Sequence, residues 1–475
     1  MTAESTWPGW LRRRSGVELL GPPRLFFAWL AIALSLFLVA YVGAWNANHY
    51  PTALGYDATE HMTYAHNLLH NHQLPSAATH GEYNTPPAYY FLAGLAASAG
   101  HRFFGWHEAD GDRSIEPSYR GAQYLNVVFE LLTALCILWL ALRIAPRSPG
   151  VWAGAVGFFA LLPVVSKTAA MFHPENLNML TSAAAVAAAT DLLITRKFRR
   201  WVIAVLIAGI VIGMLTRTSA MFTVFAIAIG FAVVGLSSDV RSRLPWGRIA
   251  VVAAIVALFA VSWIGRQVLF QHQQPFGNGG GALAAALHPG SQGDPAARSH
   301  FFGLTVADVF RTPFRPTGRG EALAQNFMDT WGDWYGSFAW SSYSNAPWQP
   351  ALVLLKDQMW IGVLPSIAAL LGLFVLLAAA IRRRALLPLA LLAPIAIAGY
   401  LYRSYVVMSP DADVLKPTYI LTTTPAWAIG FGLVVAWLGA RGKLMRYGIV
   451  GLLLIFAVIE LRFTMYGIRD HRAIF

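Results

Sequence analysis

The chain has 475 residues, of which 56% are hydrophobic and only 12% are charged. A soluble protein normally carries about 25% charged residues, so this composition indicates a protein whose solvent is the lipid bilayer. The formal net charge is +12, but much of the basic charge lies in short clusters between hydrophobic segments, which is typical of membrane topology and not of a nucleic-acid site. The single cysteine, Cys136, excludes an intrachain disulfide and a multi-cysteine metal site. Arginine outnumbers lysine and alanine is abundant, which is compatible with a bacterial source.

Hydrophobic segments dominate the chain. A hydrocarbon core about 30 Å thick requires roughly 20 apolar residues per helix, and this length predicts an all-α polytopic membrane protein with about eleven spans. The predicted spans are residues 24–45, 121–143, 150–167, 175–195, 201–216, 219–237, 248–270, 359–381, 385–407, 417–438 and 446–466. The first is too long for a signal peptide and no clear cleavage site follows it. The predicted organisation is a cytoplasmic N-terminus (1–23), a transmembrane core (24–270), a large external loop (271–358) and C-terminal transmembrane helices (359–475).

The positions of the basic clusters predict the orientation. With a cytoplasmic N-terminus, every cluster falls inside, as the positive-inside rule requires. The clusters are Arg12 to Arg14, Arg143 with Arg147, Arg196 to Arg200, Arg241 to Arg248, Arg382 to Arg384 and Arg441 to Arg446. The C-terminus and two long segments, 46–120 and 271–358, then lie outside the plasma membrane, and we expect the chemistry there.

The first external segment begins with a predicted amphipathic helix. Asp57 and Glu60 have the spacing of a capping box, and His61 falls one turn beyond Asp57 on the same side. An apolar stripe suited to the membrane surface is formed by Met62, Ala65, Leu68 and Leu69. The spacing alone leaves two roles open for Asp57, a simple helix cap or a catalytic carboxylate.

The sequence that follows narrows the choice. Leu74-Pro75 is followed by Pro86-Pro87-Ala88-Tyr89-Tyr90, which opens a second amphipathic helix. Together with the acid and the histidine before them, these motifs resemble the first external loop of GT-C glycosyltransferases, closest to bacterial relatives of protein O-mannosyltransferases and aminoarabinose transferases (family 39-like). Many members have adjacent Asp-Glu acids where this chain has Asp57-Ala58.

The resemblance implies an activity and a site. It implies a glycosyltransferase, hexosyl or pentosyl, that uses a polyprenyl-phosphate sugar and a glycan, lipid or protein acceptor of the cell envelope. Asp57 corresponds to the catalytic base, and Glu60 and His61 beside it are predicted substrate contacts. The later tripeptide His173-Pro174-Glu175 resembles the second acidic position of the family, which implies that Glu175, with His173, faces the active site. The alternative for Glu175 is a favourable charge at a helix N-terminus.

Basic residues on the same side are candidate phosphate ligands. Arg217 lies in a hairpin too short to leave the membrane interface, where it either snorkels or binds a lipid-linked phosphate. Lys416 and Tyr419 stand in a stretch that resembles the Arg-Tyr-x-x-Pro motif late in many family members, and Arg403 is a third candidate. No nucleic-acid partner is expected.

Three further features leave alternatives open. The aromatic stretch 330–340 is either an interfacial belt or a platform for sugar rings and the polyprenyl tail. The glycine-rich segment 277–281 is interpreted as a linker, because no strand precedes it and no Gly-Lys-Ser/Thr follows. His66 and His70 have ligand-compatible spacing, and His61 and His72 lie nearby, but ordinary interfacial histidines are the simpler interpretation. We therefore expect no cofactor, with a divalent metal left as an alternative.

Rival functions also remain. A transporter or flippase would require paired charges at the midplane and an internal repeat, and no convincing repeat is visible. A lipid-linked glycan polymerase or ligase would share a related fold, and a non-catalytic subunit of an envelope assembly is a further alternative.

Overall fold

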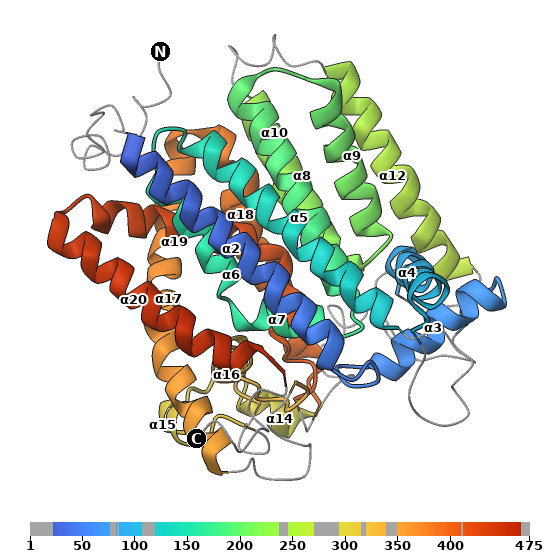
Figure 1. Cartoon of the computed structure of the whole chain (residues 1–475). Helices are drawn as coiled ribbons and strands as arrows, with labels where there is room; N and C mark the ends of the chain where they lie inside the picture. Colours follow the sequence, from blue (N-terminus) through green and yellow to red (C-terminus); the bar gives the residue numbers. More distant parts are fainter. Residues whose placement is uncertain are drawn as a thin grey trace.

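The computed structural model describes residues 22–76, 82, 85–106, 119–236, 246–269, 294–314, 320–338, 349–409 and 412–466. Within these residues the regular secondary structure is helical and contains no strand, which confirms the predicted all-α class. The long helices form one bundle, and the short helices of the two predicted external segments gather at one end of it (Figure 1). The predicted linker 277–281, the basic cluster at residues 12–14 and Trp340 lie outside the described residues.

The helices of the bundle follow the predicted spans closely. They are α2 (Pro22–His49), α5 (Arg120–Ile144), α6 (Pro149–Ala160), α7 (Pro163–Ala170), α8 (Glu175–Thr195), α9 (Arg200–Met214), α10 (Met221–Gly235), α12 (Trp246–Leu269), α17 (Gln349–Arg382), α18 (Leu387–Val406), α19 (Thr424–Gly439) and α20 (Lys443–Thr464). The α-helices of the two external segments are α3 (Ala58–His70), α4 (Ala88–Phe104), α14 (Pro295–Ser299), α15 (Val306–Arg311) and α16 (Ala322–Trp331). Three 3₁₀ helices complete the set: η3 (Thr218–Ala220), η4 (Arg384–Leu386) and η5 (Pro417–Thr423).

The predicted number of eleven spans is not confirmed. Among the described residues, eight helices are long and apolar enough to cross a membrane, and the bent pair α6 and α7 adds a ninth. These two helices meet at 47°, because Pro163 lacks the amide proton needed to continue α6, so the predicted span 150–167 is a broken one. The two remaining predictions coincide with shorter apolar helices in α9 and α12. Helix α17 starts at Gln349, well before the predicted residue 359.

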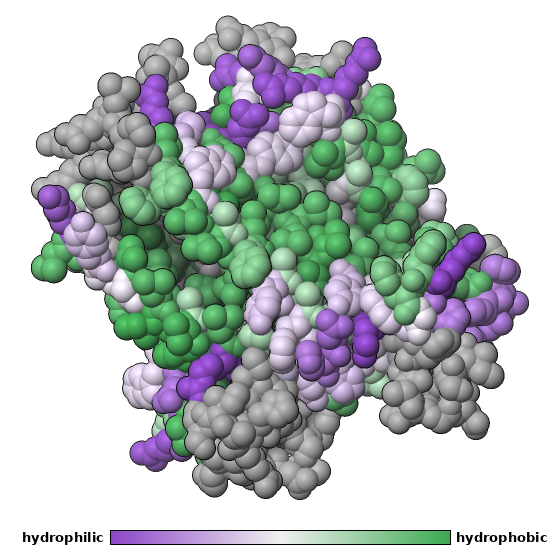
Figure 2. Space-filling model, viewed as in Figure 1, coloured by the Kyte–Doolittle hydropathy of each residue, from purple (hydrophilic) through white to green (hydrophobic). Residues whose placement is uncertain are grey.

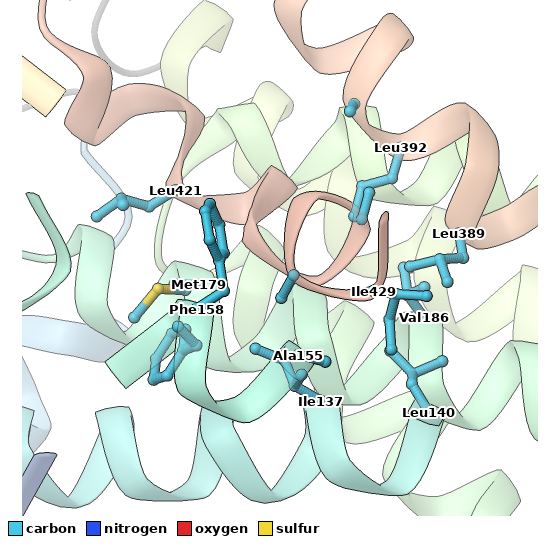
Figure 3. Packing of buried hydrophobic residues seen from close by; sticks show 14 of the residues in the cluster. Ile137, Leu140, Ala155, Phe158, Met179, Val186, Leu389, Leu392, Leu421 and Ile429 are labelled. Atoms are coloured by element: carbon cyan, nitrogen blue, oxygen red, sulfur yellow. The ribbon is translucent and has the colours of Figure 1, made fainter. Parts of the chain in front are cut away.

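The bundle packs through small residues and aliphatic side chains. A methyl group at Gly372 of α17 would lie 2.0 Å from the carbonyl oxygen of Gly430 of α19, so glycine permits these backbones to touch. Beside this contact, aliphatic side chains of α5, α6, α8, α18 and α19 meet, among them Ile137, Val186 and Leu389 (Figure 3). The described helices therefore pack around a common hydrophobic core.

The outside of the bundle is suited to lipid. Helix α17 exposes an apolar stripe at helical spacing that consists of Trp360, Leu364, Ile367, Leu371 and Phe374. On the face drawn in Figure 2, hydrophobic side chains form a band across the middle, with hydrophilic side chains gathered toward both ends. The band is what a membrane-spanning bundle requires.

Two contacts relate the ends of the helices to one another. Asn46 Nδ2, near the end of α2, donates a hydrogen bond to the Thr464 carbonyl at the end of α20 (2.8 Å). The Arg143 guanidinium at the end of α5 pairs with Asp191 near the end of α8 (3.0 Å). The start of α2 and the end of α20 are therefore at opposite ends of the bundle, as the predicted topology requires, whereas the orientation in the membrane stays a prediction.

Candidate active site

A tight turn carries the chain from α2 into α3. Gly55 has φ +115°, and a side chain there would meet Met171 Cγ at 2.9 Å, so glycine is required. Asp57 follows in the left-handed region (φ 53°, ψ 23°) and precedes the first residue of α3. Its side chain makes no capping hydrogen bond, so the predicted capping box does not form. A left-handed aspartate is sterically disfavoured, and such residues cluster at functional sites.

The carboxylate of Asp57 faces a lysine from the other end of the chain. Lys416, just before η5, places Nζ 3.4 Å from Asp57 Oδ2. The Lys416 side chain is 7% exposed, whereas that of Asp57 is 46% exposed. The ammonium also lies over the rings of Tyr56 (5.1 Å) and Tyr335 (5.6 Å), a favourable cation–π arrangement. A buried cation thus stands beside an accessible carboxylate.

Tyr56 connects this pair to a second, fully buried pair. The Tyr56 hydroxyl donates to Asp329 Oδ2 (2.8 Å), and Lys167 Nζ lies 2.6 Å from Asp329 Oδ1. Lys167 also donates to the carbonyls of Asp329 (2.9 Å) and Gly332 (3.1 Å). Burial, and then the negative charges of Asp329 and Asp333, raise the pKa of Tyr56 well above its usual value, so its hydroxyl stays a donor. This network fixes α16 against α7 underneath Asp57.

A second cluster forms around Arg217, between α9 and η3. Its Nε lies 3.0 Å from Glu175 Oε1 and its Nη1 lies 3.5 Å from Glu82 Oε2. Nη1 also donates to Thr85 Oγ1 (3.1 Å). Glu175 begins α8, and its Oε2 accepts a hydrogen bond from Asn178 (2.7 Å). The guanidinium therefore bridges two carboxylates in this structure and does not snorkel toward water.

The charges in this cluster depend on one another. Burial would raise the pKa of Glu82, but His61 in its protonated form, the charge of Arg217 and the hydrogen bond from Thr85 lower it to about 2. Burial opposes the charge of Arg217, yet Glu175 and Glu82 raise its pKa above the usual value. Both ions are therefore charged at neutral pH.

Two buried histidines lie between the charged clusters. The rings of His61 and His173 meet edge to face at 5.2 Å, and Tyr90 Oη lies 2.9 Å from His61 Nδ1. Burial lowers the pKa of His61 to about 4, against the opposing charge of Glu82, and burial also lowers that of His173. His173 Nδ1 accepts from the Glu175 amide (3.3 Å), which assigns the proton of the neutral ring to Nε2.

Comparisons with known proteins agree with this architecture. Residues 118–263 match the family model of dolichyl-phosphate-mannose-protein mannosyltransferase, whereas no curated protein sequence matches. The apo oligosaccharyltransferase of Archaeoglobus fulgidus is similar with a TM-score of 0.51 and 13% identity, over 95% of this chain and 57% of that chain. The chain has the GT-C fold. The predicted resemblance to the GT-C superfamily is thereby confirmed.

Two further solved GT-C structures are similar at lower scores. AglB of Archaeoglobus fulgidus, in complex with an inhibitory peptide and a dolichol-phosphate, gives a TM-score of 0.48 at 12% identity, over 93% of this chain and 56% of that chain. ArnT of Cupriavidus metallidurans, bound to undecaprenyl phosphate, gives 0.43 at 14% identity, over 91% and 63%. This chain thus spans a little over half the length of these proteins.

Most of the predicted site residues lie in the two charged clusters or in the histidine pair between them. The clusters already described contain Asp57, Lys416, His61, His173, Glu175 and Arg217. Arg403, exposed in the last turn of α18, lies 5.9 Å from the ring of Tyr419 in η5. Glu60 lies on α3 and is exposed. The roles predicted for all of these residues remain proposals.

The aromatic stretch of the second external segment has a different role from either predicted alternative. Trp331, Trp334, Tyr335 and Phe338 are each at most 2% exposed. Trp331 Nε1 donates to Ser366 Oγ (2.8 Å) and the Tyr335 hydroxyl donates to the Ala412 carbonyl (2.6 Å). These rings pack the external segment onto the bundle, so they are neither an interfacial belt nor an open platform.

Several residues of the site were not predicted. Lys167 lies in an apolar span, and an intramembrane charge is a signal of function, but its partner Asp329 is 162 residues away. Glu82 and Thr85 lie within the motif region of the first external segment, where no local pattern indicates that they meet Arg217. Long-range contacts of this kind carry no periodicity in the sequence.

The donor groups do not fit a pre-formed metal site. No three His, Cys, Asp or Glu side chains among the described residues converge closely enough to hold a metal ion. Asp57 and Glu175, the acids best placed for such a role, each face a basic side chain. The rings of His66 and His70 stack at 4.5 Å, and no third ligand joins them within the described residues.

Proposed function

We propose that this protein transfers a sugar from a polyprenyl-phosphate-linked donor to a cell-envelope acceptor, a glycan, lipid or protein, at the outer face of the plasma membrane. The observation that carries the proposal is the state of Asp57. Its carboxylate makes no capping hydrogen bond to the backbone of α3 and is about half exposed. It lies 3.4 Å from the ammonium of the buried Lys416. A simple helix cap would use its carboxylate on the backbone.

The chemistry follows from these groups. Asp57 accepts the proton of an acceptor hydroxyl as its oxygen attacks the anomeric carbon of the sugar. The bond between that carbon and the phosphate oxygen breaks, and polyprenyl phosphate leaves with the bonding electrons. Lys416 stabilises the growing negative charge of the leaving phosphate. General base catalysis requires Asp57 to lie within hydrogen-bond reach of the hydroxyl, which its exposure permits.

The class of donor is argued from the membrane and from the family. The site lies at the end of the bundle where α2 ends, which is the outer end if the basic clusters are cytoplasmic. Nucleotide sugars are cytoplasmic, whereas a polyprenyl carrier delivers an activated sugar at the outer leaflet. The family model matched by residues 118–263 carries a dolichyl-phosphate sugar in its description, which supports a carrier of this class.

A reconstituted transfer assay tests the proposal. Purified protein in liposomes is incubated with radiolabelled polyprenyl-phosphate hexoses and pentoses together with envelope glycan, lipid and protein acceptors. We expect labelled acceptor and free polyprenyl phosphate in equal amounts. Movement of the lipid between leaflets without sugar transfer would contradict the proposal and favour a flippase, and transfer only from diphosphate-linked donors would favour a polymerase or ligase.

Cysteine labelling tests the side of the membrane. Cys136 is the single cysteine, so a Cys136→Ala background permits one reporter at a time. Asn71→Cys, just after α3, should react with an impermeant maleimide from outside, and Lys197→Cys, after α8, should react after permeabilisation. Labelling of position 197 from outside would overturn the orientation and the outer-face assignment.

A further inference from the structure

The Arg217 cluster contains an anion-binding arrangement occupied by a carboxylate of the protein itself. Glu82 Oε2 accepts a hydrogen bond from Thr85 Oγ1 (2.6 Å) and lies 3.5 Å from Arg217 Nη1. Nη1 and Oγ1 are themselves hydrogen-bonded at 3.1 Å. One guanidinium nitrogen and one hydroxyl therefore converge on a single carboxylate oxygen. These are the same kinds of donor that a phosphate oxygen requires.

The two carboxylates on Arg217 are held very differently. The Glu175 side chain is 1% exposed, its Oε1 lies 3.0 Å from Nε, and its Oε2 accepts a hydrogen bond from Asn178. Glu82 is 22% exposed and its contact with the guanidinium is the longer one at 3.5 Å. Removing a carboxylate from a buried pair is far more costly than removing one that reaches water. Glu82 is thus the partner that an incoming anion can replace.

The charges around Arg217 also favour displacement of Glu82 by an anion. One guanidinium faces two carboxylates, so the three side chains together carry one excess negative charge when both carboxylates are ionised. A phosphate brought beside this cluster would be repelled while Glu82 remains in place. If Glu82 moves away, the remaining pair is neutral, and Nη1 and the Thr85 hydroxyl are left without their anionic partner.

We propose that Arg217 Nη1 and Thr85 Oγ1 form a binding site for a phosphate oxygen of the polyprenyl carrier, and that the Glu82 carboxylate occupies this site until the carrier displaces it. The inference rests on the carrier class of the proposed function and adds two residues to it. Glu82 lowers the affinity for the carrier and, by returning to Arg217, helps the product phosphate to leave. Thr85 is a binding residue of the site, and Glu175 holds the guanidinium in position throughout.

Binding of undecaprenyl phosphate, measured without any sugar transfer, tests the inference. The probe is titrated into the full-length protein in phosphatidylcholine nanodiscs. Glu82→Gln, which keeps the shape but removes the charge, should bind about tenfold tighter than wild type, because a charge-assisted hydrogen bond no longer has to be broken. Thr85→Val should bind several-fold more weakly, whereas Thr85→Ser, which retains the hydroxyl, should bind as wild type does.

Matched controls separate occupancy of the site from general electrostatics. Asp413→Asn removes an exposed carboxylate from the loop that carries Lys416 and should change the affinity much less than Glu82→Gln. An equal gain in both variants would overturn the inference, as would unchanged affinity in Glu82→Gln, or in a Thr85→Val protein that unfolds at the wild-type temperature. Competition by phosphatidylglycerol at equal affinity would overturn the assignment to the carrier. A wild-type protein that does not bind undecaprenyl phosphate would instead contradict the proposed function itself.

Discussion

Two lysine–aspartate pairs contact the same tyrosine, Tyr56, yet they differ in distance and in the exposure of the aspartate. Lys167 and Asp329 are 2.6 Å apart and at most 1% exposed. Lys416 and Asp57 are 3.4 Å apart, and the aspartate is 46% exposed. Tyr56, the neighbour of Asp57, donates to Asp329 and lies beneath Lys416, so the two pairs share one support.

The difference distinguishes a fully buried ion pair from one whose carboxylate is accessible. A buried pair with every contact satisfied resists solvent and substrate, so its function is to hold segments together. A carboxylate that is half exposed and held by one long contact can exchange that contact for a substrate hydroxyl. Residue type alone does not distinguish these roles, because both pairs use the same two amino acids.

The largest expected effect is on turnover, from Asp57→Asn. Asparagine keeps the shape of the side chain and is tolerated in the left-handed backbone region, but it cannot accept the proton. Base catalysis of this type contributes about 10²- to 10⁴-fold, so sugar transfer should fall by that factor while the unfolding temperature and carrier binding persist. Glu60→Gln, one turn further along α3, is the matched control and should retain much of the activity. Wild-type turnover in Asp57→Asn would place the base elsewhere, with Glu175 the next residue to test.

The second effect is on stability, from Lys167→Met. Removing one partner of a buried pair leaves Asp329 uncompensated and should lower the free energy of unfolding by about 3 to 5 kcal/mol. Thermal unfolding in detergent measures this loss. The double variant Lys167→Met with Asp329→Leu should recover much of the loss, because no isolated charge remains. Equal destabilisation by Lys416→Met would erase the distinction between the two pairs.

The third effect is on donor binding, from Lys416→Met. A charge-assisted contact with phosphate contributes about 1.5 to 3 kcal/mol, so the affinity for a polyprenyl-phosphate sugar should fall by about 10- to 100-fold with little change in acceptor affinity. Lys416→Arg should preserve much of it. Unchanged donor affinity in Lys416→Met would leave this lysine as a partner of Asp57 alone.

The smallest effect is expected from Tyr56→Phe, which removes the hydroxyl that connects the Lys416–Asp57 pair to the Lys167–Asp329 pair. The ring remains beneath Lys416, but the hydrogen bond to Asp329 is lost at a cost of about 1.5 kcal/mol, the lower end for a hydrogen bond to a charged group. We expect a slight fall in the unfolding temperature and a fall in turnover at unchanged donor affinity, since Asp57 is positioned less well. Loss of donor binding instead would mean that Tyr56 contacts the carrier directly.

Local patterns predicted most of the long helices, but not the break between α6 and α7 or the short helices α14, α15 and α16. Apolar length predicted the spans, and amphipathic spacing predicted α3 and α4, because both signals depend on residues close together in the chain. The same reasoning failed where a contact overrides a local preference. Asp57 has the spacing of a cap but turns its carboxylate away from α3, and the aromatic side chains of residues 331–338 are packing residues because the bundle covers them.

The sequence by itself determined the membrane environment, the helical class and the GT-C resemblance, and it singled out Asp57 as the residue to test. These follow from composition, from hydrophobic length and from a motif confined to one loop. Only the tertiary structure decided the partners: Lys416 for Asp57, Asp329 for Lys167, and both Glu82 and Glu175 for Arg217. Ion pairs between residues of different helices and loops depend on how the helices pack, and charge–charge contacts of this kind follow no periodic rule that a single sequence displays.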